Sequence, residues 1–322
     1  MDKWVDQLNS RAQILIDQVI SARLAGQQTG QDMSWLERQF REKIERLYAE
    51  EYASANLRDN SDLVLRAEGP GTDHFSPSLH SFNWMADHVN RQLGKLSVSV
   101  LPLAVDDAKR AAKRLKWAFT GYAPGSIMMG FALKQPDSLA GFEESDRLAF
   151  TAVSESAQAI ASIPQFIGNT EIDASIIERI PDPALRDSAV MAAWYLSPTP
   201  QSGIHTIEVA SKLGDHGSLS QRERMVLKTV IDNPDLRQKR QGSFVGSLRA
   251  ADLDKHRAVL RDVNGLESPI RCILDDKMDS HLKFCFGSRV KVSGIYETDR
   301  EGRPRLMYVN HLEPDNSQAT IV

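Results

Sequence analysis

Residues 270–292 read IRCILDDKMDSHLKFCFGSRVKV, and the spacing of their apolar side chains changes twice. Within 270–274 every second residue is apolar, which is the period of a half-buried strand. Between 278 and 285 the apolar Met, Leu and Cys recur at four- and three-residue spacing, which is typical of one face of a short helix. Alternation returns at 289–292. This stretch therefore predicts a strand, a short helix and a second strand.

More strands are predicted on both sides of this stretch. Alternating apolar residues precede it at 244–248 and 258–260, and Asn264-Gly265 supplies a strong hairpin turn signal. A charged loop at 299–304 then separates the strand after the helix from a last strand around 306–310. The predicted order over residues 241–315 is three strands, a helix and two strands.

This order is the topology of the OB-fold, a small five-stranded barrel. The run FGSRVKVSG at 286–294, followed by DREGRP at 299–304, also resembles the closing hairpin of OB-like tails in uncharacterised bacterial proteins. The resemblance covers the last quarter of the chain and implies a fold rather than an activity. The rest of the sequence resembles no family that we recognise.

The N-terminal residues 1–60 are predicted to form a helical hairpin. Apolar side chains recur at near-helical spacing in two arms, the first ending near Gly26 and the second starting at Ser34. Two antiparallel helices of this length commonly pack on each other or on a partner. We therefore expect the hairpin to bind a protein partner or to form a homodimer.

The middle of the chain is predicted to be an α+β body, at 61–196, that is rich in helix and contains a sheet of two to four strands. A basic helix is expected from Asp106 to Phe119. The Pro- and Ser-containing segment after Leu196 indicates a linker at 197–240 with a short strand and a helix. We expect residues 316–322 to be a disordered tail. The predicted class is α+β, with a helical hairpin first and a small OB-like β-barrel last.

Composition favours a bacterial cytoplasmic protein. The 322 residues carry 41% hydrophobic and 25% charged side chains, ordinary values for a globular protein. The N-terminus lacks the basic and apolar pattern of a secretory signal, and no run is apolar enough for a membrane span. Cys272 and Cys285 are the two cysteines, and their apolar surroundings favour buried core thiols over metal ligands. We expect no membrane contact.

The predicted barrel suggests contact with nucleic acid, single-stranded more than duplex. Basic residues at positions expected to face outward would follow a phosphate backbone: Arg249, Lys255, Arg257, Arg261, Arg289 and Lys291. Tyr296 is a candidate stacking platform, whereas the phenylalanines at 244, 284 and 286 are expected to be internal. A net charge of −4 and interleaved acids equally fit a solvated face of mixed charge.

The loop at 69–80 concentrates the best catalytic candidates, because it places polar residues after a predicted strand. These candidates are Asp73, His74, Ser76 and His80. Polar capping of a strand-to-helix loop explains the same residues without catalysis. The two glycines at 69 and 71 are too few for a dinucleotide fingerprint. No cofactor or metal is predicted.

Three functional hypotheses follow. The preferred one is a non-enzymatic binding or adaptor protein whose OB-like tail contacts nucleic acid. The second is a protein-interaction subunit, for example an antitoxin-like or defence-accessory component that acts with a neighbouring enzyme. The third is a hydrolase that uses the 69–80 loop.

Overall fold

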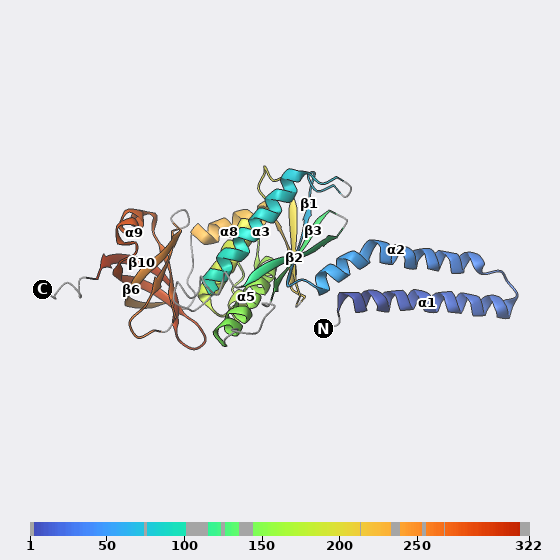
Figure 1. Cartoon of the computed structure of the whole chain (residues 1–322), viewed down its shortest axis with the longest axis horizontal. Helices are drawn as coiled ribbons and strands as arrows, with labels where there is room; N and C mark the ends of the chain where they lie inside the picture. Colours follow the sequence, from blue (N-terminus) through green and yellow to red (C-terminus); the bar gives the residue numbers. More distant parts are fainter. Residues whose placement is uncertain are drawn as a thin grey trace.

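The chain is organised as an arm, a body and a barrel that follow one another along its length (Figure 1). The computed structural model describes residues 3–73, 76–100, 115–123, 126–134, 144–212, 214–232, 239–252, 256–266 and 268–315. The helical hairpin projects from one end of the body, and the barrel lies at the other end (Figure 1). The predicted α+β class is confirmed.

The arm consists of two antiparallel helices, α1 (Trp4–Thr29) and α2 (Ser34–Asp59). The turn between them uses Gly30 at φ 68°, a left-handed conformation that suits a residue without a Cβ. At the other end, the Asp59 carboxylate accepts hydrogen bonds from the backbone N–H groups of Trp4 and Val5, at 2.8 and 3.0 Å. The last residue of α2 therefore caps the first turn of α1 and closes the hairpin next to the body.

The body is built on a five-stranded sheet with the order β2-β3-β1-β4-β5. Its strands are β1 (Leu63–Glu68), β2 (Lys116–Ala123), β3 (Ile127–Lys134), β4 (Thr206–Ser211) and β5 (His216–Ser220), and all neighbours pair antiparallel. The sheet thus exceeds the two to four strands that we expected. Residues 116–119 are also strand rather than the end of the predicted basic helix, whose residues 106–114 lie outside the described residues.

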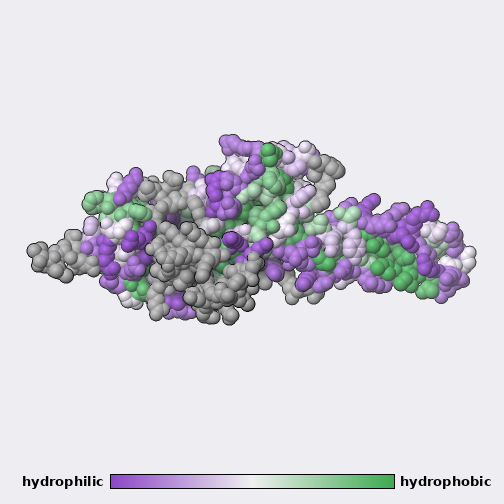
Figure 2. Space-filling view, in the orientation of Figure 1, coloured by the Kyte–Doolittle hydropathy of each residue, from purple (hydrophilic) through white to green (hydrophobic). Residues whose placement is uncertain are grey.

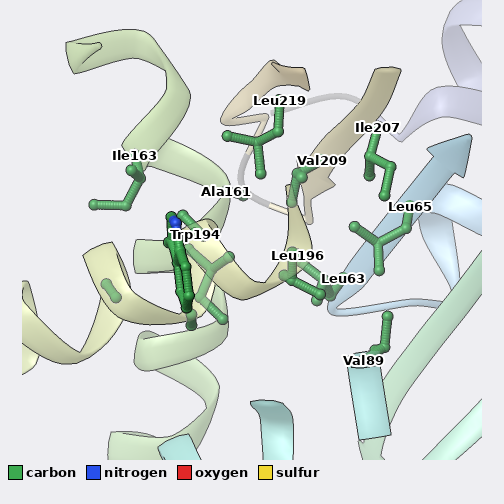
Figure 3. Packing of buried hydrophobic residues seen from close by; sticks show 14 of the residues in the cluster. Leu63, Leu65, Val89, Ala161, Ile163, Trp194, Leu196, Ile207, Val209 and Leu219 are labelled. Atoms are coloured by element: carbon green, nitrogen blue, oxygen red, sulfur yellow. The ribbon is translucent and has the colours of Figure 1, made fainter. Parts of the chain in front are cut away.

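Helices cover the sheet and complete one continuous core. They are α3 (Leu79–Val100), α5 (Glu144–Ser162), the 3-10 turn η1 (Ile163–Phe166), α6 (Ile176–Arg179), α7 (Pro183–Leu196) and α8 (Gln221–Asp232). Figure 3 shows strand residues such as Leu65 and Val209 meeting Leu196 of α7 and Val89 of α3. These four side chains are buried. Burial of this apolar area is the main stabilising term for the body.

Within the segment 197–240, predicted as a linker, residues 197–212 and 214–232 are part of the body instead. Its two strands extend the sheet beyond β1, and Leu219 and Leu227 are fully buried in the main core. Ser202, within the Pro- and Ser-containing stretch, is also fully buried. Its hydroxyl donates to the carbonyl of Thr199 at 2.8 Å. Polar residues therefore form an ordered buried turn here rather than a solvated connection.

The C-terminal region closes into a five-stranded barrel. Its elements are β6 (Arg240–Asp252), β7 (Arg257–Arg261), β8 (Ile270–Leu274), η3 (Asp276–Met278), α9 (Asp279–Cys285), β9 (Arg289–Thr298) and β10 (Pro304–Pro314). The barrel order is β10-β8-β7-β6-β9, and β8 with β10 is the parallel pair. This strand order, with a helix between the third and fourth strands, is the predicted OB-like arrangement.

The short helix α9 closes the barrel because its apolar side points inward. Leu282 is fully buried and Cys285 nearly so, both within the barrel core. Cys285 and Cys272 are free thiols in that core, as predicted. Burial raises the pKa of the Cys272 thiol to about 12, so the group stays protonated near neutral pH.

No helix among the described residues is both long enough and apolar enough to cross a membrane.

Candidate functional site

The structure gives the 69–80 loop a structural task. Asp73 accepts a hydrogen bond from the backbone N–H of Ser76 at 3.1 Å, and a ring nitrogen of His80 lies 3.0 Å from the carbonyl oxygen of Gln201. Ser76 and His80 are exposed, and His74 lies outside the described residues. The Asp73 carboxylate and the His80 ring thus each contact a backbone group, as the capping alternative expects.

This loop packs directly against the turn at 199–205. Gly71 donates its N–H to the carbonyl of Gly203 at 2.8 Å, and the buried Ser81 hydroxyl donates to the carbonyl of Ser202 at 2.8 Å. A Cβ at Gly71 would lie 2.1 Å from the Ser81 Oγ. The absence of a side chain at this position allows the two segments to approach, so the glycine serves packing here.

Two of the predicted nucleic-acid residues are buried, which corrects the expectation that they face outward. Arg257 and Arg261 on β7 are 5% and 6% exposed. The Arg257 guanidinium binds both carboxylate oxygens of Asp187 on α7, at 3.1 and 3.3 Å. Arg271 on the neighbouring strand β8 binds the same carboxylate. Strand alternation correctly placed Arg257 outside the barrel interior, but it could not show that another part of the chain covers that surface.

Asp187 is the centre of this contact between the barrel and the body. Burial opposes its ionisation, yet the charges and hydrogen bonds of Arg257 and Arg271 outweigh burial and lower the pKa of Asp187 to about 2. The carboxylate is therefore ionised throughout the neutral range. Arg257 also donates to the backbone carbonyl of Ile231 at 3.1 Å, which ties β7 to the end of α8.

Two further ion pairs join α7 to the barrel. Arg186 binds Glu297 of β9, and Asp182, which also caps the start of α7, binds Arg305 of β10 with Oδ2 to Nε at 3.0 Å. We call these two pairs together with the Asp187 pairs the α7 clamp. In an OB-fold the surface of the second and third strands is the usual oligonucleotide site. Here those strands are β7 and β8, and α7 covers them.

The other predicted nucleic-acid residues are distributed over the rest of the barrel. Arg289 and Lys291 on β9 pair with Asp315 and Glu313, at 3.5 and 3.3 Å. Arg249 on β6 is exposed, and Lys255 lies outside the described residues.

Tyr296 is half-buried and not the open stacking platform that we expected. Its ring lies edge-on to the ring of Phe244, with 5.1 Å between centroids, and both rings pack against the barrel core.

Two exposed aromatic side chains of the barrel were missed in the sequence. Phe284 is 80% exposed and Phe286 is 52% exposed, although both were expected to be internal. The sequence did contain a signal for Phe284, because it falls between the inward-facing Leu282 and Cys285 and therefore on the opposite side of α9. Figure 2 shows an apolar, green area at the part of the barrel where α9 lies.

The arm carries the other prominent group of exposed apolar side chains. Ile16, Ile20 and Leu24 are 39% to 52% exposed and recur every four residues along one side of α1. The Tyr48 hydroxyl donates to Asn9 Oδ1 at 2.7 Å, and Asn9 precedes Ile16 by seven residues on the same side of α1. Tyr48 therefore belongs to this side of the hairpin.

Tyr52 extends this surface, with its ring centroid 6.3 Å from that of Tyr48. We define the arm face by its five members: Ile16, Ile20, Leu24, Tyr48 and Tyr52. Figure 2 shows a green area on the projecting hairpin.

The seam between α1 and α2 is apolar mainly next to the body. The cluster built on Leu8, Ala12, Leu47 and Ala55 lies in the half of the arm closest to the sheet. Toward the tip, Ala22 is the buried apolar residue of α1 among those described, and the ion pair between Arg23 and Glu37, at 2.9 Å, bridges the helices. The outer half therefore buries little apolar surface within a single chain.

A polar cleft of about 370 Å³ lies where the arm meets the sheet. Three arginines line it, and each pairs with an acid: Arg11 binds Glu51, Arg58 binds Glu208 at 3.1 Å, and Arg66 binds Glu68 at 3.0 Å. The Arg58 guanidinium also lies over the Trp4 ring, 4.5 Å from its centroid. These contacts fix the arm to the body, so the cleft is best explained as a joint.

Compared with family models, with curated proteins and with solved structures, the chain has no match.

Proposed function

We propose that the protein is a non-enzymatic adaptor that assembles through its arm, and that the arm face of one chain packs on the arm face of a second copy. The observation that carries this proposal is the row of large apolar side chains on a hairpin that projects away from the body (Figures 1 and 2). Contiguous exposed apolar surface of this kind marks interaction sites.

Geometry favours a second copy as the occupant of the arm face. Both helices have 26 residues, or about 39 Å of helix at 1.5 Å per residue. Two such hairpins related by a two-fold axis would form a four-helix bundle in which each arm face covers its equivalent. The apolar residues left exposed toward the tip of each arm would then become core.

Charge along α2 supports an antiparallel arrangement of the two arms. The outer half, 34–46, has four basic and three acidic residues: Arg38, Arg41, Lys43 and Arg46 against Glu37, Glu42 and Glu45. The inner half, 47–59, has one basic and three acidic residues: Arg58 against Glu50, Glu51 and Asp59. Antiparallel packing would place the basic outer half of one α2 near the acidic inner half of the other, which favours this register.

Sedimentation equilibrium of the full chain tests the proposal. We expect a dimer for the natural sequence and a monomer for the double variant Ile16→Glu/Ile20→Glu, because each substitution would bury a charge in the contact. Ile14→Glu is the matched control, since Ile14 is 61% exposed but lies two residues, about 200° of helix rotation, from Ile16. A natural chain that is monomeric at all concentrations, or a double variant that still dimerises, would show that the proposal is wrong.

A further inference from the structure

The barrel has one strongly basic side that the body does not cover. This side lacks acidic residues, which is unusual in a chain whose net charge is negative. Residues 239–251, which include most of β6, and residues 280–296, from α9 through most of β9, contain no acidic residue. Their basic residues are Lys239, Arg240, Arg249, Lys283, Arg289 and Lys291. Strands β6 and β9 pair antiparallel from Arg240 opposite Tyr296 to Ser247 opposite Arg289, so the two acid-free segments form one surface.

The outward side chains of this surface are mainly small, polar or basic. Phe244, Leu248, Val290 and Val292 belong to the barrel core. By strand alternation the outward positions are Ser243, Val245 and Ser247 on β6 and Arg289, Lys291 and Ser293 on β9. Ser243 and Ser293 are a cross-strand pair whose hydroxyls lie 2.7 Å apart. Such a surface lets an extended ligand lie close to the strands.

The exposed aromatic residues lie at one end of this surface. Leu248 of β6 accepts a hydrogen bond from Gly287 at 2.9 Å and donates one to Ser288 at 3.0 Å. Arg249 follows Leu248, and Phe286 precedes Gly287, so backbone pairing brings Arg249 and Phe286 to the same end of the barrel. Lys283 and Phe284 are adjacent, exposed residues in the last turn of α9.

We infer that this end of the barrel binds single-stranded nucleic acid, with Phe284 and Phe286 stacking on bases and Arg249, Lys283 and the β9 cations contacting phosphates. Aromatic platforms beside a positive groove are the combination that single-strand binders use. The basic surroundings favour nucleic acid over a protein partner as the ligand. A protein that bound only through apolar contacts with the two phenylalanines would not require a surface without acidic residues. Duplex DNA would hide its base faces from the two phenylalanines.

The inferred site differs from the usual OB surface. The α7 clamp covers β7 and β8, whereas the surface proposed here is formed by β6, β9 and the end of α9. Its acidic partners come from the end of β10 and the residue after it, where Glu313 and Asp315 pair with Lys291 and Arg289. Phosphates would compete with these two exchangeable partners, so we expect binding to weaken strongly with salt.

Fluorescence anisotropy with the full chain tests this inference. The probes are labelled oligo-dT and oligo-rU of about 16 nucleotides, the upper site size for one OB barrel, and a duplex of equal length. We expect both single strands to bind more tightly than the duplex. The variant Phe284→Ala/Phe286→Ala should weaken single-strand binding at least about tenfold, because each stacked base contributes substantially.

A charge variant within the inferred site is compared with control variants at exposed residues outside it. Tyr122→Ala on β2, where the side chain is 72% exposed, should leave binding unchanged. Lys283→Glu should weaken binding and lower the slope of log affinity against log salt by about 0.7 for each phosphate that the variant no longer neutralises. Lys116→Glu, at an exposed lysine of β2, should do neither.

The inference is overturned if the natural chain binds neither strand at about 50 mM salt, or if the double phenylalanine variant binds as tightly as the natural chain. It is also overturned if that variant changes only the oligomeric state, because the aromatic pair would then be a protein contact. Dimerisation through the arm is measured separately in the same samples, so failure here leaves the arm proposal intact.

Discussion

Replacing Asp187 by Asn should loosen the contact between barrel and body, because the carboxylate binds Arg257 and Arg271 at once. Burial opposes ionisation of Asp187, but the two guanidinium groups hold its pKa down at about 2. Removing one partner of a buried ion pair costs about 3 to 5 kcal/mol. We therefore expect Asp187→Asn to destabilise the clamp by about 3 kcal/mol at neutral pH.

Urea unfolding at several pH values provides the assay. The folded-state pKa of Asp187 is depressed, so its contribution is complete above the unfolded value near 3.8 and declines as pH falls toward about 2. The difference in midpoint between the natural chain and Asp187→Asn should therefore be large at about pH 6 and shrink below about pH 4. Midpoints are the appropriate measure because a chain with several units need not unfold in two states.

Glu50→Gln is the control for this experiment. Glu50 pairs with Arg46 at 4.0 Å on the exposed side of α2, and such a pair contributes about 0 to 1 kcal/mol. If Asp187→Asn is as stable as the Glu50→Gln control at neutral pH, or if its deficit is the same at every pH, then the clamp does not hold the barrel on the body.

Three other predictions concern the packing of the chain. Gly71→Ala should lower the free energy of unfolding by about 1 to 3 kcal/mol in thermal unfolding, because the new Cβ would lie 2.1 Å from the Ser81 Oγ. Adding Ser81→Ala should recover part of this loss. If the costs of the two substitutions are strictly additive, the proposed packing is wrong. Asp59→Ala should remove the cap on α1 at a cost of about 1 kcal/mol, seen as faster amide exchange in its first turn, while unchanged exchange would refute the capping role. Cys272, whose pKa is raised to about 12 by burial, should resist thiol reagents at about pH 8 until urea is added, and rapid labelling of the folded chain would contradict its position in the core.

The barrel was predictable from sequence because its signals are local. A change from two-residue to helical spacing and back, together with the Asn264-Gly265 turn, depends only on neighbouring residues. Gly265 indeed adopts φ 77° in a turn closed by a hydrogen bond from the Leu266 N–H to the Val263 carbonyl at 3.0 Å. The turn lies within the eight-residue connection 262–269 between β7 and β8, so it is not the tight hairpin that the Asn-Gly pair predicted. The helical hairpin was predictable for the same reason.

Long-range burial could not be predicted from those local patterns. Alternation showed that Arg257 leaves the barrel interior, but only the tertiary structure brings Asp187, 70 residues earlier in the chain, against it. The stretch around Ser202 likewise suggested a linker because it is polar. The hydrogen-bond partners that allow it to be buried are distant in sequence, since Ser81 lies 121 residues earlier in the chain. The predicted site residues depended on such long-range contacts. The structure therefore corrected the predicted sites more than it corrected the predicted fold.

Pulsed dipolar spectroscopy on a spin-labelled Gln13→Cys chain tests the central claim most directly. Gln13 is exposed and lies three residues before Ile16, on the same side of α1 as the arm face, while the natural cysteines are buried. Pairing of arm faces predicts a dipolar coupling between labels on two chains, which disappears on dilution with unlabelled chain and is absent in the Ile16→Glu/Ile20→Glu background. Labels that remain magnetically isolated in the natural background, or a coupling that survives the two glutamates, would contradict assembly through the arm.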